Sequence, residues 1–293
     1  TFKVLVYPEP FVNLITSLPY CDDNDDGDDT NGIIQIIDLK GKIPEILGPN
    51  RSPNDYDVSF YNFEGDELPS PYTNTFDKET IYVRVQNRLS KCINDSNSFQ
   101  LIVNPLPSFT VTSPQILCLN DLPLNISVES HSMDIYTYIW KDQNGNILPS
   151  PNKDNIDIFS GGKYFVTATA TNGTLCSRTE MIEVIESNIA TLQNNYVTII
   201  DESNNIGNQN NLSISIDTIT NNLGPGDYQF AIINTDTNER FPFAGFQDEP
   251  LFENLEGGIY KIIVNDKNGC SPDDESLLVS VIQFPKFFTP NGD

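Results

Sequence analysis

An acidic loop, CDDNDDGDDTNG at 21–32, holds the residues best suited to chemistry. It opens with the pattern D-x-[DN]-x-[DN]-G of a calcium-binding loop, in which oxygens at alternate positions converge on one cation. The residues that fit this pattern are Asp22, Asn24, Asp26 and Gly27. Position twelve, where a bidentate glutamate is expected, is Ile33, so further ligands would come from Asp28, Asp29 or Asp38. The sequence predicts calcium as a cofactor, and the alternative is an acidic loop that is merely solvated.

Catalysis finds little support in the sequence. The chain has one histidine, His131 in the polar stretch SHSMD, which we interpret as a surface residue. The motifs HExxH, GxSxG, GxGxxG and the P-loop do not occur. With 41 Asp and Glu residues a carboxylate pair for glycoside hydrolysis stays open, but no pair is singled out. We therefore expect no enzyme.

The charge balance restricts the partners of the chain. Lys+Arg 16 against Asp+Glu 41 gives a net charge of -25, which repels nucleic acid phosphates and anionic lipid heads. No run of about 18 apolar residues is present, so we expect no membrane span. The chain has no initiator Met and no signal peptide, and TFKVLVYPEP already has the pattern of a strand. We expect both ends to continue into a longer protein.

Five cysteines are spaced at the scale of domains. None lies in a CxxC pair, which argues against zinc or thiol-redox chemistry, and wide spacing is typical of structural disulfides in exported proteins. One disulfide per module would pair Cys21 with Cys92 and Cys118 with Cys176. Cys270 is left over, either free or paired outside this sequence.

A sequence motif of about 15 residues occurs three times. Each copy is a Tyr-led strand of alternating apolar and polar residues, followed by a turn and a cysteine. The copies are TIYVRVQNRLSKC (80–92), GGKYFVTATATNGTLC (161–176) and GGIYKIIVNDKNGC (257–270). A strand running into proline, as in FKVLVYPEPF (2–11) and FQLIVNPLPSF (99–109), marks the end of a module, because proline cannot donate to a sheet ladder.

The residue pattern along the whole chain indicates an all-β protein. Short strands rich in Val, Ile, Tyr and Thr, such as 33–39, 124–129 and 212–217, alternate with Asn, Asp, Gly and Pro turns. Trp140 between Cys118 and Cys176 follows the order of an immunoglobulin core, although no tyrosine precedes the second cysteine by two residues. We predict tandem immunoglobulin-like or PKD-like β-sandwich modules. The predicted units are 1–8 (last strand of a preceding module), 9–105, 106–186, 187–283 and a terminal segment, 284–293.

Aromatic residues raise the possibility of glycan binding. Tyr136, Tyr138 and Trp140 share one face of a strand, and we interpret them as core. The stretch FPFAGF, with Phe241, Phe243 and Phe246, is a loop that is either exposed and adhesive or folded onto its module.

The last ten residues, FPKFFTPNGD, carry a resemblance to a known family. They resemble the opening of the type B, gliding-motility-associated C-terminal sorting domain of Bacteroidota proteins exported by the type IX secretion system. The segment 223–293 resembles the module joined to such signals, and 21–39 resembles modules repeated in large surface adhesins. Asp217-Thr218-Ile219 resembles the short Bacteroidota O-glycosylation motif, so Thr218 is a candidate glycosylation site. The sorting residues would be Phe284, Pro285, Lys286, Phe287, Phe288, Thr289, Pro290, Asn291, Gly292 and Asp293.

This resemblance implies a function. The chain would be the stalk of an adhesin for gliding motility or surface attachment, held extracellularly at the outer membrane. The implied partners are a PorP/SprF-like outer-membrane protein and the type IX translocon with its PorV-like shuttle, with a surface or glycan ligand bound further upstream. The alternatives are accessory modules of a secreted hydrolase, or a glycan-binding module.

Overall fold

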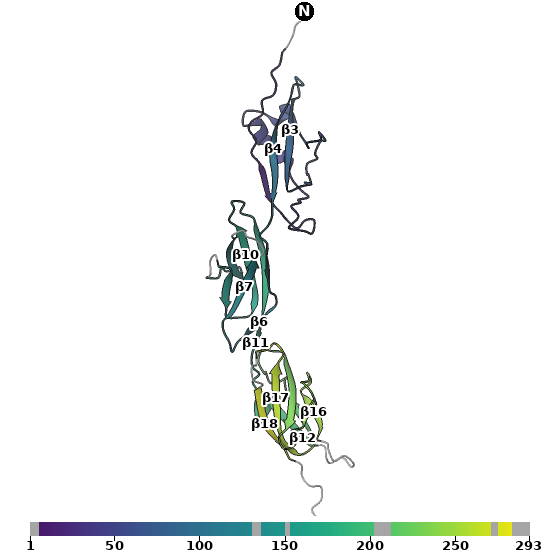
Figure 1. Ribbon diagram of the computed structural model, residues 1–293, viewed down its shortest axis with the longest axis vertical. Helices are drawn as coiled ribbons and strands as arrows, with labels where there is room; N and C mark the ends of the chain where they lie inside the picture. Colours follow the sequence, from purple (N-terminus) through teal and green to yellow (C-terminus); the bar gives the residue numbers. More distant parts are fainter. Residues whose placement is uncertain (1–5, 131–135, 150–152, 202–211, 271–274, 283–293) are drawn as a thin grey trace, which may run out of the picture.

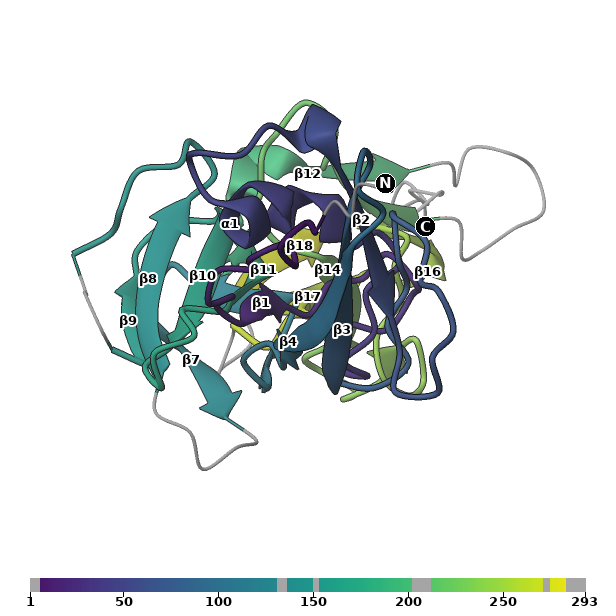
Figure 2. The same ribbon diagram turned by 90° about the horizontal axis from the view of Figure 1, so that it is seen from above.

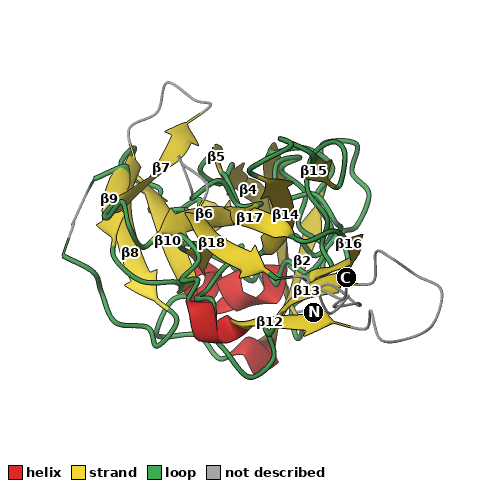
Figure 3. Cartoon of the chain, turned by 90° about the horizontal axis from the view of Figure 1, so that it is seen from below, coloured by secondary structure: helices red, strands yellow, loops and turns green. Residues whose placement is uncertain are grey.

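Three β modules follow one another along an elongated chain (Figure 1). The computed structural model describes residues 6–130, 136–149, 153–201, 212–270 and 275–282. Strands and loops account for nearly all of it, with short helical turns between them (Figure 3), so the prediction of an all-β chain is confirmed. Three separate hydrophobic clusters lie within residues 12–103, 109–184 and 190–281, which we call modules 1, 2 and 3. Along the long axis the modules are seen one behind another (Figure 2).

Module 2 has the strand order of an immunoglobulin-like sandwich. One sheet has the order β5-β7-β9 and the other β6-β11-β10-β8, which correspond to strands A-B-E and A′-G-F-C of that fold. Strand β6 runs parallel to β11, and the other neighbours are antiparallel. The strands are β5 (Phe109–Val111), β6 (Gln115–Cys118), β7 (Leu124–Ser130), β8 (Tyr136–Asp142), β9 (Asn155–Ile158), β10 (Gly162–Ala170) and β11 (Ser177–Ser187).

The core of module 2 follows from the alternation of side chains along its strands. Trp140 is 1% exposed, and its indole Nε1–H donates to the carbonyl of Lys153 at 3.0 Å. Tyr138 is buried on the same face of β8, in edge-to-face contact with Phe109. The core interpretation of this aromatic strand is therefore confirmed.

Module 3 repeats the two-sheet plan. Its sheets have the orders β12-β13-β16 and β15-β14-β17-β18, with all neighbours antiparallel. The elements are η3 (Asn194–Tyr196), β12 (Val197–Asp201), β13 (Leu212–Ile216), β14 (Tyr228–Asn234), β15 (Arg240–Phe241), β16 (Leu251–Leu255), β17 (Gly258–Asp266) and β18 (Glu275–Val281).

Module 1 has one sheet, of order β1-β4-β3-β2, with β1 parallel to β4. The strand expected at 33–39 is wrong: Ile37 forms an isolated bridge with Tyr72, and short helices follow. Pro44 near the N-terminus of α1 favours helix, and Gly48 at φ 73° ends it. The elements are β1 (Leu18–Cys21), η1 (Leu39–Lys42), α1 (Ile43–Leu47), η2 (Pro53–Asp55), β2 (Tyr56–Tyr61), β3 (Lys78–Asn87) and β4 (Ile93–Asn104).

The tyrosines of the threefold repeat do not share one position. Tyr164 and Tyr260 are buried, and each hydroxyl donates to the carbonyl four residues earlier, at 2.8 and 2.9 Å. Tyr82 is 41% exposed, because Ile81 and Val83 face the core of module 1 instead. A shift by one residue reverses the face of every side chain in a strand. The equivalence of Tyr82 with the other two tyrosines is therefore wrong.

Candidate functional site: the disulfide-bonded joints

Both disulfides connect neighbouring modules. Cys21 of module 1 bonds to Cys176 of module 2, with a Cα–Cα distance of 5.4 Å. Cys118 of module 2 bonds to Cys270 of module 3, with a Cα–Cα distance of 5.2 Å. The predicted pairs Cys21–Cys92 and Cys118–Cys176 are wrong, and Cys92 is the free cysteine. Cys270, left over in the sequence analysis, has its partner in module 2.

The fold explains why a module does not close its own disulfide. In module 2, Cys118 lies opposite Ser187 at the end of β11, whereas Cys176 directly precedes the start of that strand. An 11-residue strand at about 3.3 Å per residue separates them by roughly 35 Å. A disulfide requires Cα atoms within about 7 Å. Module 1 has the same problem, because Cys21 lies opposite Asn104 at the end of β4 and Cys92 precedes its start.

One construction produces both joints. A short strand runs parallel to the last strand of its module and carries a cysteine at its C-terminal end, as β1 does with Cys21 and β6 with Cys118. The following module offers a cysteine from the turn between its last two strands, Cys176 or Cys270. Parallel pairing thus places one cysteine at the C-terminal end of the last strand of a module. The cysteine in the hairpin turn of the next module lies beside it.

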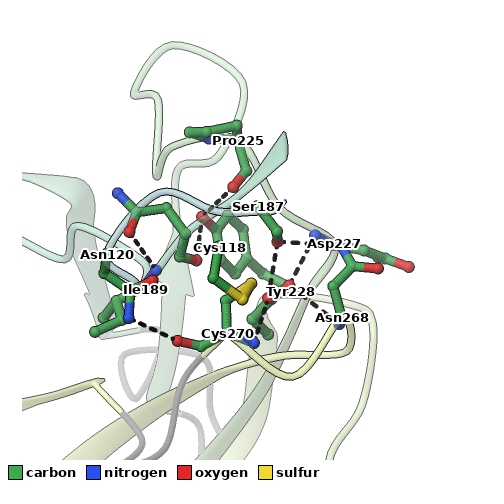
Figure 4. The surroundings of a disulfide bond; sticks show 11 residues. Cys118, Asn120, Ser187, Ile189, Pro225, Asp227, Tyr228, Asn268 and Cys270 are labelled. Carbon is green, nitrogen blue, oxygen red and sulfur yellow. Dashed lines mark hydrogen bonds between the residues drawn. A yellow bond between two sulfur atoms is a disulfide. The ribbon is translucent and has the colours of Figure 1, made fainter. Parts of the chain in front are cut away.

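Asp266 organises the joint between modules 2 and 3 through its hydrogen bonds to Ser187 and Cys270. Figure 4 shows Ser187, Asn268 and the Cys118–Cys270 disulfide close together at this joint. Asp266 is 2% exposed at the end of β17. Its Oδ2 accepts hydrogen bonds from the Cys270 N–H at 3.1 Å and from the Ser187 hydroxyl of module 2 at 2.8 Å. Its Oδ1 accepts from the N–H groups of Asp227 at 3.2 Å and Asn268 at 3.3 Å. One carboxyl group therefore holds the Cys270 turn and connects it to the last strand of module 2.

Further hydrogen bonds cross the same joint. The Asn268 amide donates to the Ser187 hydroxyl at 3.1 Å, and the Asn120 amide of module 2 donates to the Cys270 carbonyl at 3.2 Å. The Tyr228 hydroxyl donates to the carbonyl of Asn188 at 3.1 Å, and burial raises the pKa of this tyrosine. Ser187 is fully buried, so its hydrogen bond to Asp266 is shielded from water.

The joint between modules 1 and 2 depends more on covalent structure. Pro105 and Pro107 restrict the backbone of the linker. Arg178 of module 2 pairs with Asp29 of module 1 at 3.5 Å, and with Glu180 at 2.9 Å. The side chains of Arg178 and Asp29 are each 27% exposed, so water still screens this pair, and such ion pairs near the surface contribute about 0–1 kcal/mol.

The acidic loop closes on itself beside this joint. Asp22 is 4% exposed, and its carboxyl accepts the N–H of Gly32 at 2.8 Å and of Asp23 at 2.9 Å. Asp26 accepts the Asn31 amide at 2.7 Å and the N–H of Asp28 at 3.0 Å.

Burial raises the pKa of the Asp22 carboxyl, with its backbone hydrogen bonds opposing the shift. The hydrogen bond from Asn31 lowers the pKa of Asp26.

The six predicted calcium ligands are not gathered around one point. Asp28 accepts the hydroxyl of Thr30, Asp29 pairs with Arg178, and Asp38 accepts the hydroxyl of Ser70. Among the residues that the structure describes, no group of three or more His, Cys, Asp and Glu side chains is placed to hold a metal. Calcium binding by Asp22, Asn24, Asp26, Asp28, Asp29 and Asp38 stays a prediction.

The other predicted site residues are dispersed. In the FPFAGF loop, Phe243 is 94% exposed, Phe246 lies under the Arg240 guanidinium at 4.8 Å, and Phe241 packs against the core of module 3. Phe243 is therefore the one fully exposed ring of the three, and Phe241 and Phe246 are half-buried. Thr218 is exposed just after β13. His131 and the sorting residues Phe284 to Asp293 lie outside the described residues.

Residues 17–107 match the family described as the Flavobacterium inter-domain disulphide bond domain. The match covers module 1 from residue 17 onward and the first residues of the linker, and it includes Cys21 and Cys92. The description agrees with the connection from Cys21 to the next module. No curated protein matches the chain.

Solved structures with several extracellular or capsid domains align with the chain. Three N-terminal domains of the highly immunogenic outer capsid protein of bacteriophage RB49 align at 10% identity and a TM-score of 0.37, covering 79% of this chain and 87% of theirs. Extracellular domains 3–5 of Drosophila OTK align at 10% identity and a TM-score of 0.35, covering 94% and 97%. Because these scores are low, the immunoglobulin-like assignment rests on the strand order of the modules themselves.

No helix among the described residues is long and apolar enough to cross a membrane. Disulfides persist in oxidising compartments, so the two crosslinks place these modules outside the cytoplasm.

Proposed function

We propose that the chain is the stiff, non-catalytic stalk of an exported bacterial surface adhesin. The observation that carries this proposal is that each disulfide crosses a joint, from Cys21 to Cys176 and from Cys118 to Cys270. Each joint thereby has two covalent connections, the linker backbone and the disulfide. A module held at two separate points cannot swing about its linker as a singly tethered module does. Such an array carries an end domain away from the cell surface at a fixed distance.

The route to the surface is a second part of the proposal. The resemblance of residues 284–293 to a type B sorting domain supports export by the type IX system. A PorP/SprF-like outer-membrane protein, the translocon and its PorV-like shuttle would be the partners. Surface labelling of cells that lack the translocon tests this route, since labelling equal to that of the parent cells would contradict it.

Small-angle scattering of disulfide variants tests the stalk. We expect Cys21→Ser/Cys176→Ser to lower the radius of gyration and broaden the distribution of distances, because among the described residues the first joint then keeps its prolyl linker and one half-buried ion pair. We expect a smaller change for Cys118→Ser/Cys270→Ser, because the bonds of Asp266 and Ser187 remain at the second joint.

Cys92→Ser is the matched control, since it removes a cysteine and leaves both crosslinks in place. Its scattering should equal that of the parent chain. Parent-like scattering from both double variants would show that the disulfides do not set the shape, and would contradict the stalk proposal.

Calcium binding by the acidic loop is a further proposal, tested by thermal unfolding. Six aspartates between 22 and 29 repel one another, so a bound cation should favour the folded module. At 100 times its Kd, calcium would add about 2.7 kcal/mol, or ten degrees or more in Tm for a module of this size. We expect Asp22→Ala/Asp26→Ala to abolish this calcium-dependent increment.

The increment, and not Tm itself, is the informative quantity, because Asp22→Ala also breaks hydrogen bonds that hold the loop. Asp236→Ala/Glu253→Ala removes the same charge at exposed positions of module 3 and should keep the increment. An equal Tm with calcium and with chelator in the parent chain would contradict calcium binding by this loop.

A further inference from the structure

Cys92 occupies the same place in module 1 as the two bonded hairpin cysteines in modules 2 and 3. All three lie in the turn between the last two strands of their module. The residue before each has a positive φ: 59° at Lys91, 60° at Leu175 and 82° at Gly269. The Asn87 N–H donates to the Cys92 carbonyl at 3.0 Å, and the Ala170 N–H donates to the Cys176 carbonyl at 2.9 Å. Cys92 is therefore the third copy of one structural position.

The other two copies of this position both hold a partner. Cys176 bonds to the module before it, and so does Cys270. These two sulfurs are enclosed by their joints, with residue exposures of 0% and 2%. Cys92 is free and partly exposed. Two of the three cysteines at this position therefore form a disulfide with the preceding module.

The segment before module 1 has the pattern of a linker at a joint. Tyr7-Pro8-Glu9-Pro10 repeats the pattern of Asn104-Pro105-Leu106-Pro107 between modules 1 and 2. In the later joint, Asn104 lies opposite Cys21 in the parallel register. Tyr7 holds the position of Asn104 in this comparison, and its carbonyl lies 3.8 Å from the Cys92 sulfur. A cysteine opposite Tyr7 in the same register would arrive beside the free thiol.

The surface around Cys92 can receive another module. An open hollow of about 620 Å³ lies at this end of module 1, lined by the 7–11 segment and the Asn87–Ser90 turn. Its rim exposes apolar side chains: Tyr7 is 47% exposed, Phe11 61% and Leu89 85%. The Asn94 amide fixes the segment in place by donating to the Pro10 carbonyl at 2.9 Å. Exposed apolar side chains close to a free thiol form a surface that a docked module would cover.

We propose that Cys92 forms a third inter-module disulfide, with a β module that precedes residue 1 in the same polypeptide. The partner is a cysteine at the end of a short strand parallel to the last strand of that module. Because the observed pairs are 155 and 152 residues apart, the partner lies about 150 residues before Cys92. The reaction removes one hydrogen from each thiol, and the two electrons reduce a disulfide oxidant of the export compartment to two thiols.

Peptide mapping of the complete exported polypeptide tests this inference. Free thiols are first blocked with N-ethylmaleimide under denaturing conditions, and the protein is then digested without reduction. We expect the Cys92 peptide to be crosslinked to an upstream cysteine peptide of the same chain, and to appear alone only after reduction. A Cys92 peptide carrying N-ethylmaleimide, glutathione or a second Cys92 peptide would overturn the proposal.

The test is independent of the stalk itself. The Cys21–Cys176 and Cys118–Cys270 peptides provide internal references in the same digest. In the polypeptide that carries Cys92→Ser, we expect the upstream cysteine to gain one N-ethylmaleimide while both references stay bonded. If no upstream cysteine gains N-ethylmaleimide in this variant compared with the parent polypeptide, the proposal is also overturned.

Discussion

Pulling the oxidised chain from its two ends should extend it to about 350 Å, compared with about 1000 Å after reduction, at about 3.5 Å per residue. The two disulfides overlap in sequence, because Cys118 lies between Cys21 and Cys176. The shortest covalent path therefore runs through residues 1–21, crosses to 176, returns to 118 and crosses again to 270. Residues 22–117 and 177–269 lie outside this path and bear no force at full extension. Single-molecule force spectroscopy measures this length directly.

The same measurement distinguishes the two disulfide patterns. Bonds within modules, Cys21–Cys92 and Cys118–Cys176, would shorten the chain less and give about 600 Å. A length near that value in the oxidised chain would contradict the structure. Cys92→Ser should leave the oxidised length unchanged, and it also prevents exchange between thiols during pulling.

Replacing Asp266 by alanine should lower the free energy of unfolding of module 3 by about 3–5 kcal/mol, because hydrogen bonds to a charged group contribute about 1.5–3 kcal/mol each and buried donors are left without an acceptor. The buried donors are the Cys270 N–H and the Ser187 hydroxyl, and the N–H groups of Asp227 and Asn268 are partly buried donors. For a domain of this size the loss corresponds to more than ten degrees in Tm. Differential scanning calorimetry resolves it as an earlier transition.

Two control variants distinguish the contribution of Asp266 to the Cys270 turn from its contribution to the contact between modules 2 and 3. Asp248→Ala removes an exposed carboxylate that pairs with Lys267 at 2.7 Å, and should change the stability by less than about 1 kcal/mol. Ser187→Ala removes the hydrogen bonds that its hydroxyl makes with Asp266 and Asn268 across the joint, but keeps the three backbone N–H bonds to Asp266, so we expect a loss of about 1–2 kcal/mol. A Tm for Asp266→Ala equal to that of the parent chain would contradict the role assigned to this carboxyl group.

The sequence predicts the all-β fold because alternation and turn chemistry are local. Strands such as β7, β8, β13 and β14 lie where alternating residues place them. The segment 33–39 was mistaken for a strand, since apolar residues alone do not distinguish a strand from a loop packed on a sheet. Tyr82 was aligned with the buried Tyr164 and Tyr260 although it is exposed, because the register of a strand is set by its neighbours and one residue of shift reverses its faces.

The disulfide pattern could not be derived from spacing. Cys118 and Cys176 belong to one module, and only the parallel pairing of β6 with β11 shows that they lie at its opposite ends. That pairing is non-local, so no short sequence motif reports it. The signal that was available is the repeat itself: a cysteine closes the same hairpin in all three modules, and an earlier cysteine ends a short strand in modules 1 and 2.

Asp266 was also missed in the sequence. It stands four residues before Cys270 in the turn DKNGC, where an aspartate can accept the following backbone N–H groups. Its bond to Ser187 depends on the placement of two modules, which the sequence does not report.

The central claim is that the crosslinks join modules, and disulfide mapping of this chain without reduction tests it most directly. In residues 1–293 alone, proteolysis followed by mass spectrometry should yield Cys21 bonded to Cys176 and Cys118 bonded to Cys270. Cys92, which has no partner cysteine within these residues, should carry the alkylating agent. Peptides that join Cys21 to Cys92 or Cys118 to Cys176 would contradict the account, and the stalk would then lose the structural basis proposed for its stiffness.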